Sequence, residues 1–435
     1  MKSNLRIAIN AQVSLGTGAG GVETVLRTLA SLGRLDGEEE YIFIGHWSDA
    51  DWLKPLLNER QTLVQAPSPK EYKSIVSENF RRSLGALRPL ARKVKRAFAP
   101  PPKTQITIPV SNGFYENLGC DVIHFPYQKY VLCSTPTVYN PHDLQHLHYP
   151  QFFSREEISK RETIYPGACR AARVVVVASE FVKQDVMRNY GIEADKIQVI
   201  PWSPPEMTLE KTTKEEARLL SEKYEISDAP FALYPAITWE HKNHIRLLEA
   251  IARLRDGGDL KVNLICTGQK NSFFSEIERR LQELKLEKQV KFLGVVSYKE
   301  LSNLYLRAQF VIIPTLFEAA SAPLFEAWQR NVAVACSSVT SLPEQSDGAA
   351  LLFNPFSIEE IADTLKKMSL DESLRAELRA KGTSRLRNFS LDRTLKAYRA
   401  VYRKAAGLKL NDEDRDLLSR DWMSERNISS RANLR

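Results

Sequence analysis

Short apolar runs alternate with amphipathic helical patterns through the first half of the chain. The first run, residues 5–10, leads into a glycine-rich stretch and then into Val22, Val25, Leu26 and Leu29, which recur with helical spacing. Because strand-like and helical patterns alternate, we expect a mostly parallel sheet with helices on its faces. Further strand-like runs occupy residues 40–46, 120–126, 136–144, 172–179 and 196–201.

The same alternation restarts after a polar, proline-containing stretch at residues 201–226, which we interpret as a linker followed by a helix. The sequence therefore predicts an α/β protein with two Rossmann-like domains that face each other across a cleft, with ligands at the carboxyl ends of the strands. Strand-like runs of the second half occupy residues 231–237, 261–268, 290–296, 310–315 and 332–337.

The length of 435 residues exceeds what one ordinary core organises, which agrees with two domains. We expect an N-terminal domain at 1–205, a C-terminal domain at 206–388, a helix at 389–408 that packs back on the N-terminal domain, and a polar, solvated tail at 409–435.

The cysteine pattern and the apolar runs indicate the compartment. Five cysteines are scattered without any C-x-x-C pair, so neither a disulfide framework nor a zinc site is indicated. The opening "MKSNLRIAIN" lacks the apolar stretch of a signal peptide, and no run approaches the roughly 20 apolar residues of a spanning helix. We therefore expect a cytoplasmic protein.

The net charge of +8 is concentrated in one segment, because residues 79–103 hold eight basic residues and no acidic residue. The rest of the chain is balanced, so nucleic acid is not an expected partner. Apolar residues recur at helical spacing within this segment, which is typical of a helix on an anionic membrane surface. A solvated loop explains the pattern equally well.

Two glutamates flank a helix start that the sequence predicts near Ser321 to Pro323. Glu318 follows the buried run 310–315, and Glu326 lies about one turn into the helix. Free N–H groups at such a helix start suit an anion, and carboxylates suit sugar hydroxyl groups. The alternative is that both glutamates only favour the helix start electrostatically.

Other polar residues also follow predicted strands. His241, Lys242 and Asn243 lie between a strand and a helix, where a lysine can meet a phosphate, or can be an ordinary solvated lysine. Gly268 ends another strand, where the backbone can approach a flat base closely. A cluster at His142, His146 and His148 could suggest a metal, but we expect none.

These motifs, taken in order, resemble the retaining glycosyltransferases of family four, which have the GT-B fold. The resemblance covers roughly residues 5–405. Its C-terminal elements are "TWEHKNHIRLLEA", "TGQ", "VKFLGVVSYKELSNLY", "FVIIPTLFEAASAPLFEA" and "SLPEQSDGAALLFNP". Its N-terminal elements are "GAGGVETVLRTLA", "NPHDLQHLHYP" and "VVVASEFVKQDVMRNYGIEADKIQVIP".

The resemblance implies roles for individual residues of this chain. Catalytic roles fall to Glu318 at the donor sugar, Lys242 at the diphosphate and His142 across the cleft. Glu326 is implied to bind the ribose. The other implied donor-binding residues are Gly20 and Gly21, which let the domains close, Val295 near the base, the backbone of Ala320, Ser321 and Ala322, and Thr238, His241, Asn243, Gly268 and Pro323.

The chain departs from the family at two points. Ile237 stands where the family often has an arginine, so one phosphate contact is missing unless His241 or His244 supplies it. The loop "EAASAP" replaces the family's E-G-F-G-L-P, which predicts a somewhat different fit to the sugar.

The resemblance implies hexose transfer from a nucleotide-sugar to a saccharide or lipid-linked saccharide in surface polysaccharide assembly, by a metal-independent front-face mechanism without a cofactor. GDP-mannose is the favoured donor. Residues 79–103 are a candidate contact to the inner face of the cell membrane. The alternatives are a nucleotide-sugar epimerase or hydrolase of the same fold, and a non-catalytic sugar- or membrane-binding protein.

Overall fold

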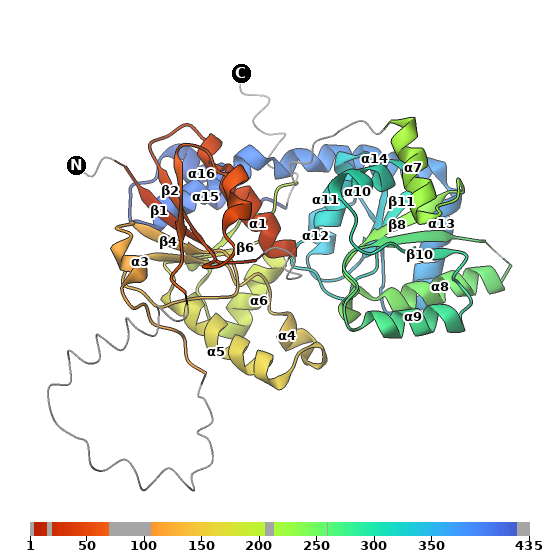
Figure 1. The fold of residues 1–435 in the computed structure, drawn as a ribbon, viewed down its shortest axis with the longest axis horizontal. Helices are drawn as coiled ribbons and strands as arrows, with labels where there is room; N and C mark the ends of the chain where they lie inside the picture. The colour runs from red at the N-terminus through yellow and green to blue at the C-terminus, as the bar shows by residue number, and fades with distance from the viewer. Residues whose placement is uncertain (1–3, 15–19, 69–105, 205–212, 259, 424–435) are drawn as a thin grey trace, which may run out of the picture.

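The computed structural model describes residues 4–14, 20–68, 106–204, 213–258 and 260–423 of the chain. Figure 1 shows two α/β units side by side, each built around its own sheet. The predicted fold class, α/β with two Rossmann-like units, is therefore confirmed. The basic segment 79–103 lies outside the described residues, so its two interpretations stay open.

The described part of the first unit forms a seven-stranded sheet in the order β3-β2-β1-β4-β5-β6-β7, and all neighbouring strands are parallel. Its strands are almost continuously apolar because helices cover both faces. They are β1 (Arg6–Ala11), β2 (Glu40–Gly45), β3 (Gln61–Gln65), β4 (Val122–Phe125), β5 (Thr137–Tyr139), β6 (Val174–Val177) and β7 (Ile197–Val199).

The described part of the second unit forms a six-stranded parallel sheet in the order β10-β9-β8-β11-β12-β13. In both sheets the strand order reverses beside the first strand of the unit, and ligands of such sheets bind at this reversal, outside the carboxyl ends of the strands. The strands are β8 (Phe231–Pro235), β9 (Asn263–Thr267), β10 (Val290–Phe292), β11 (Phe310–Ile313), β12 (Val334–Ser337) and β13 (Leu351–Phe353).

Helices connect the strands, and several begin with a side-chain cap that satisfies free N–H groups. Ser297 and Glu300, for example, form a capping box at the start of α10. The helices of the first unit are α1 (Gly20–Ala30), α3 (Phe114–Asn117), α4 (Gln145–His148), α5 (Arg155–Ala171) and α6 (Glu180–Tyr190). Those of the second unit are α7 (Lys214–Tyr224), α8 (His244–Asp256), α9 (Phe274–Glu283), α10 (Tyr298–Arg307), α11 (Ala322–Gln329), α12 (Leu342–Ser346), α13 (Ile358–Leu370) and α14 (Glu372–Leu386).

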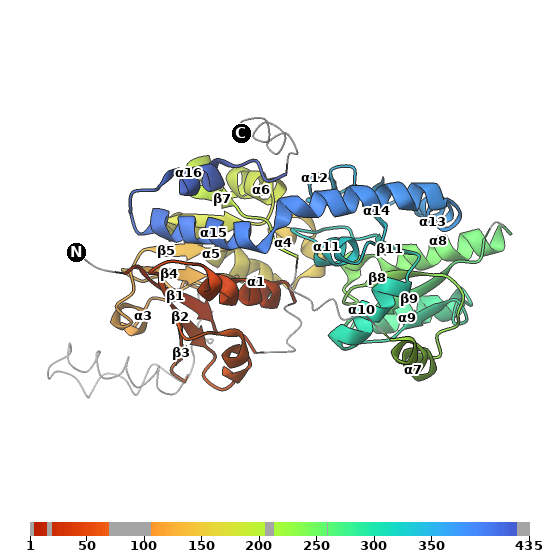
Figure 2. The ribbon, with the colours of Figure 1, turned by 90° about the horizontal axis from the view of Figure 1, so that it is seen from above.

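The C-terminal helices return to the first unit. Figure 2 shows α14 over the second unit and α15 (Leu391–Ala405) over the first, with α16 (Asp412–Ser419) beside it. Leu395, Val401 and Tyr402 of α15 are buried in the core of the first unit. The short 3-10 helices are η1 (Ser31–Arg34), η2 (Asp51–Leu56), η3 (Pro150–Phe152), η4 (Ala194–Lys196), η5 (Glu240–Lys242) and η6 (Arg387–Phe389).

The structure corrects one expectation and adds two strands that were not predicted. Residues 409–435 do not form a solvated tail throughout, because Leu417 of α16 and the following Trp422 are only 5% and 2% exposed. Their apolar side chains are too widely spaced in a charged sequence to be recognised before packing is known. The edge strands β3 and β13 were also not predicted, since they are short and only partly buried. Within the described residues no helix is long and apolar enough to cross a membrane.

Candidate active site

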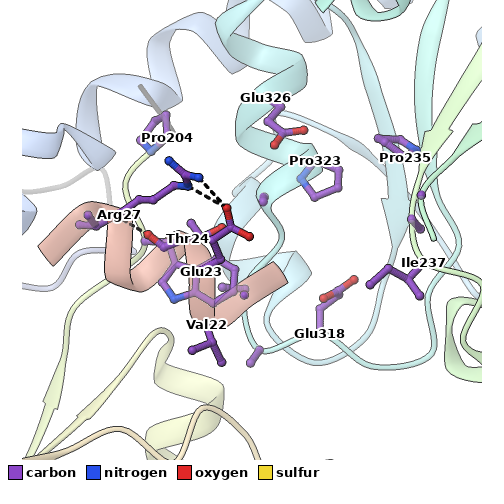
Figure 3. A pocket seen from close by; sticks show the side chains of 18 of the residues that line it. Val22, Glu23, Thr24, Arg27, Pro204, Pro235, Ile237, Glu318, Pro323 and Glu326 are labelled. Atoms are coloured by element: carbon purple, nitrogen blue, oxygen red, sulfur yellow. Dashed lines mark hydrogen bonds and ion pairs between the residues drawn. The ribbon is translucent and has the colours of Figure 1, made fainter. Parts of the chain in front are cut away.

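A cleft of about 1060 Å³ lies between the two units and is lined by residues of both. The second unit contributes the loops after β8 and β11 and the start of α11, which lie at the reversal of strand order. The first unit contributes one face of α1 and the segment around His142. Figure 3 shows side chains from both units extending into this space.

Glu318 lies in the loop directly after β11. Its carboxylate accepts a hydrogen bond from Lys242 Nζ at 2.6 Å, and these side chains are 13% and 19% exposed. Its backbone is fixed on both sides, because its N–H donates to Thr340 Oγ1 at 3.0 Å and its carbonyl accepts from Ser341 Oγ at 2.9 Å. Burial raises the pKa of Glu318, while the Lys242 ammonium opposes that rise.

The loop that carries Lys242 is tied to the loop that carries Glu318. The Tyr234 hydroxyl donates to the Lys242 carbonyl at 2.8 Å, and Leu316 N–H donates to the His241 carbonyl at 2.7 Å. Asn243 adopts a left-handed φ of 62° and donates its amide to two further loop carbonyls, those of Pro314 and Pro355. Asn243 therefore links the loop that carries Lys242 to the loops after β11 and β13, and it does not line the cleft.

Glu326 projects into the cleft from α11 (Figure 3). Its carboxylate accepts a hydrogen bond from the Tyr305 hydroxyl at 2.6 Å. Burial raises the pKa of Glu326, and the Tyr305 hydrogen bond and the Arg330 charge partly offset this rise. The Arg330 guanidinium also donates to the Glu326 carbonyl at 3.1 Å, which fixes the backbone at this turn of the helix.

The helix start predicted near Ser321 to Pro323 is confirmed, because α11 begins at Ala322 and Ser321 precedes it. Ser321 N–H donates to Gln345 Oε1 at 3.1 Å, and Ser321 is buried behind the cleft wall. Ala320, Ala322 and Pro323 line the cleft. Their small or rigid side chains leave the helix start close to any ligand in the cleft.

His142 faces this wall from the first unit. It has a left-handed φ of 66°, and Nε2 lies 2.8 Å from the Pro126 carbonyl. A carbonyl can only accept, so Nε2 carries the proton and Nδ1 is an acceptor. Burial lowers the pKa of His142. Gly21 also lines the cleft, and a Cβ on it would lie 2.9 Å from the Trp202 ring.

The remaining predicted residues have four different positions. His241 and Gly268 line the cleft, and Gly268 has a φ of 122° with no room for a Cβ against Ala236. Thr238 is buried and donates to Asn271 Oδ1 at 2.9 Å, so it braces a loop. Val295 is 75% exposed outside the cleft lining. Gly20 is the first residue of α1, directly before Gly21.

Neither histidine near the departure at Ile237 carries a positive charge. Burial and the nearby Lys242 ammonium hold the pKa of His241 well below its usual range and lower that of His244 to about 3. His244 also packs between the rings of Tyr234 and Phe292. The sequence left open whether one of these histidines replaces the family's arginine, and their neutral state makes them unsuited to it.

The three histidines after β5 do not share a site. His146 Nε2 lies 2.7 Å from a Glu162 oxygen, and His148 Nε2 lies 2.8 Å from an Asp185 oxygen. In the described part of the chain no group of three or more His, Cys, Asp or Glu side chains is placed to hold a metal ion.

The polar face of α1 lines the cleft and was not predicted from the sequence. Glu23, Thr24, Arg27 and Thr28 line the cleft together with Val22, whereas Val25, Leu26 and Leu29 are buried in the core. The apolar face of this helix was recognised, so its complement could have been proposed as a cleft wall. Trp202, Trp239 and Tyr298 also line the cleft and carried no local signal.

Two family models match adjacent parts of the chain. Residues 19–202 match the model described as Glycosyltransferase Family 4, and residues 217–385 match Glycosyl transferases group 1. Among solved structures, a glycosyltransferase from Rickettsia africae ESF-5 is similar over 92% of this chain and 98% of that chain, with 17% identity and a TM-score of 0.65. The chain is therefore a glycosyltransferase of the GT-B fold.

More particular relatives are found among curated proteins. The chain is 24% identical over 264 residues to O-antigen chain mannosyltransferase B of Escherichia coli, which is 60% of this chain and 69% of that protein. It is 25% identical over 215 residues to O-antigen chain mannosyltransferase RfbU of Salmonella typhimurium, which is 49% of this chain and 55% of that protein. The chain thus spans little more than half the length of the second relative.

Proposed function

We propose that this glycosyltransferase moves a hexose, with retention of the anomeric configuration, from a nucleotide-sugar to a saccharide or lipid-linked saccharide. The observation that carries the proposal is the Lys242–Glu318 pair, which faces Glu326 across the start of α11 in a cleft shared by both units. A cation, two carboxylates and a helix start are what a diphosphate-linked sugar needs for recognition.

The leaving group is a nucleoside diphosphate, whose charge grows as the bond to the sugar breaks. Lys242 and the N–H groups at the start of α11 stabilise that charge in a sheltered cleft, where such interactions are stronger than in water. This arrangement performs the role without a metal ion or a cofactor. Glu326 binds the ribose hydroxyl groups, and Gly268 lets the backbone approach the base.

The reaction proceeds on one face of the sugar. The bond between the anomeric carbon and the phosphate oxygen breaks, and the acceptor hydroxyl oxygen bonds to the same face of that carbon. The acceptor proton passes to the departing phosphate oxygen. Glu318 and Nδ1 of His142 accept hydrogen bonds from the donor sugar and fix its orientation.

The named relatives support mannose as the sugar and surface polysaccharide as the destination, since both curated proteins are O-antigen mannosyltransferases. GDP-mannose is accordingly the proposed donor. A lipid-linked acceptor would bring the enzyme to the inner face of the cell membrane, with residues 79–103 as the proposed contact.

The donor site is tested by thermal shift with GDP-, UDP-, dTDP- and ADP-sugars on wild type, Glu326→Gln and the exposed control Glu283→Gln. A donor at 100 times its dissociation constant adds about 2.7 kcal/mol of stability. We expect GDP-mannose to stabilise wild type and the control, and to stabilise Glu326→Gln much less. Equal stabilisation of all three proteins would contradict the assigned site.

The reaction class is tested by product analysis. With a polysaccharide-derived acceptor we expect an α-linked product from an α-linked donor, read from the one-bond coupling between the anomeric carbon and its proton. Turnover of the donor in the absence of any acceptor would instead favour an epimerase or a hydrolase. Donor binding without turnover under either condition would favour a non-catalytic binding protein.

A further inference from the structure

Among the described residues of the second unit, one positively charged side chain lies at the proposed diphosphate position. Lys242 is that side chain, and it forms an ion pair with Glu318 at 2.6 Å. Ile237 lines the cleft nearby without offering any hydrogen bond, and the neighbouring His241 is neutral. A nucleoside diphosphate carries at least two negative charges, so a second cation is needed to balance it.

Three other basic side chains line the cleft, namely Arg27, Arg34 and Lys299. Lys299 forms an ion pair with Glu216 of α7 at 2.6 Å, and its side chain is 56% exposed. Arg34 lies in η1, about two helical turns beyond Arg27 and so further from the glycines at the start of α1. Arg27 is therefore the best-placed cation.

Arg27 extends from α1 into the cleft, opposite the end of α11 that carries Pro323 and Glu326 (Figure 3). Glu23 accepts from its Nε and Nη2 at 2.8 Å, which holds the guanidinium fork in place. Within the described residues Nη1 of Arg27 has no hydrogen-bond partner. Its N–H groups suit the oxygens of a phosphate.

Charged residues of α1 in the first unit and of α11 in the second both act on the side chain of Tyr298. Tyr298 of α10 has its pKa raised by burial first, then by the Glu23 carboxylate, while Arg27 lowers it and Glu326 raises it. Arg27 of the first unit and Glu326 of the second are therefore both within electrostatic range of Tyr298. This agrees with a ligand that contacts both walls at once.

We propose that Arg27 is the second phosphate-binding residue of the donor site, supplied by the first unit in place of the arginine that Ile237 replaces in the second. The inference rests on the proposed nucleotide-sugar donor. The donor site is then complete only when both units contribute, so the diphosphate links the two units as it binds. A nucleoside monophosphate, held by Lys242 and Glu326, does not need Arg27.

The test measures the dissociation constants of GDP and GMP by calorimetry for wild type, Arg27→Gln, Arg27→Lys and the exposed control Arg188→Gln. Loss of a charge-assisted hydrogen bond is expected to weaken GDP binding about tenfold or more in Arg27→Gln. The affinity of Arg27→Lys for GDP should lie between those of wild type and Arg27→Gln, because a lysine keeps the positive charge but lacks the paired N–H groups of a guanidinium. GMP binding should change little in every variant.

A rescue variant separates phosphate binding from a structural role of Arg27. Ile237→Arg restores a cation on the second unit, and in the Arg27→Gln background it should recover most of the lost affinity for GDP.

Equal loss of GDP and GMP binding, or unchanged GDP binding in Arg27→Gln, overturns the inference while leaving the proposed function intact. If wild type binds neither nucleotide but binds another nucleoside diphosphate, the same comparison is made with that nucleotide and its monophosphate. If wild type binds no nucleotide of any base, the proposed function is wrong, and the inference about Arg27 is then wrong as well.

Discussion

Lys242 and Glu318 set the charge of the cleft at the scale of single residues. Their side chains meet at 2.6 Å although 76 positions separate them in the chain. Each charge compensates the other in a poorly solvated place, where an unpaired carboxylate is costly. In the donor complex that we propose, the diphosphate draws Lys242 toward itself and leaves Glu318 free to accept hydrogen bonds from sugar hydroxyl groups.

Replacing Lys242 by methionine tests this compensation. Burial already raises the pKa of Glu318, and loss of the ammonium raises it further. A carboxyl group whose pKa is raised on folding stabilises the folded state fully below its unfolded pKa, and that contribution is lost as the pH rises through the folded pKa. We expect Lys242→Met to be close to wild type at pH 5 and less stable by roughly 2 kcal/mol at pH 8.

The measurement is the melting temperature of both proteins from pH 5 to pH 8. Lys242→Met/Glu318→Gln is the matched control, because it removes the carboxylate that lost its partner and should restore a pH dependence like that of wild type. A destabilisation of Lys242→Met that does not change with pH would show that lost packing, and not the carboxylate, is responsible.

At the scale of elements, α12 of the second unit meets the start of α6 in the first. Phe181 N–H donates to Glu344 Oε1 at 3.2 Å, so a carboxylate of one unit caps a helix of the other. Beside this contact the Phe317 ring lies among the rings of His148, Tyr149 and Phe181. A polar cap and an aromatic cluster therefore lie at the contact between the units, and the Tyr149 hydroxyl adds a hydrogen bond to the Leu316 carbonyl at 3.2 Å.

The cap makes the contact between the units depend on pH. Burial, and to a smaller extent the Glu180 charge, raises the pKa of Glu344 to about 7. Its stabilising contribution is present below the unfolded pKa and is lost as the pH rises through about 7. Glu344→Gln keeps an acceptor for Phe181 N–H and has no proton to lose. We expect this variant to gain stability relative to wild type, on the order of 1–3 kcal/mol, between pH 5 and pH 8.

Thermal unfolding across that pH range checks the expectation, with Glu283→Gln on the exposed face of α9 as the control. Parallel pH profiles for wild type and Glu344→Gln would mean that Glu344 is already ionised at pH 5 and does not control the contact.

At the scale of the whole molecule, the described chain leaves the first unit for the second and later returns to the first. The linker after β7 leads to the second unit, and α15 returns to the first. Tyr402 of α15 is fully buried, and its hydroxyl lies 2.9 Å from His124 Nδ1. Arg403 pairs with Glu39 at 2.5 Å. The first unit therefore completes its core only with residues from the end of the chain.

Fragments test this dependence. We expect residues 1–204 alone to lack cooperative unfolding, because the surface covered by α15 would be exposed to water. Co-expression with residues 389–423 should restore a soluble, cooperatively unfolding complex, measured by circular dichroism during heating. Tyr402→Ala in the added segment should weaken that rescue by about 3–5 kcal/mol, the usual cost of removing a buried aromatic side chain. Cooperative unfolding of residues 1–204 alone would contradict this account.

Local sequence patterns were sufficient to predict the architecture and the segments that line the cleft. Apolar periodicity is local, so it specified most strands, the two units and the helix start at Ala322. Since parallel strands end at a common edge, it also located Lys242, Glu318 and Glu326 near the cleft. Only the tertiary structure decided the pairing of Lys242 with Glu318 and the burial of Trp422. It also decided that Arg27 faces the second unit, because such distances depend on strand order and on the packing of segments far apart in the chain.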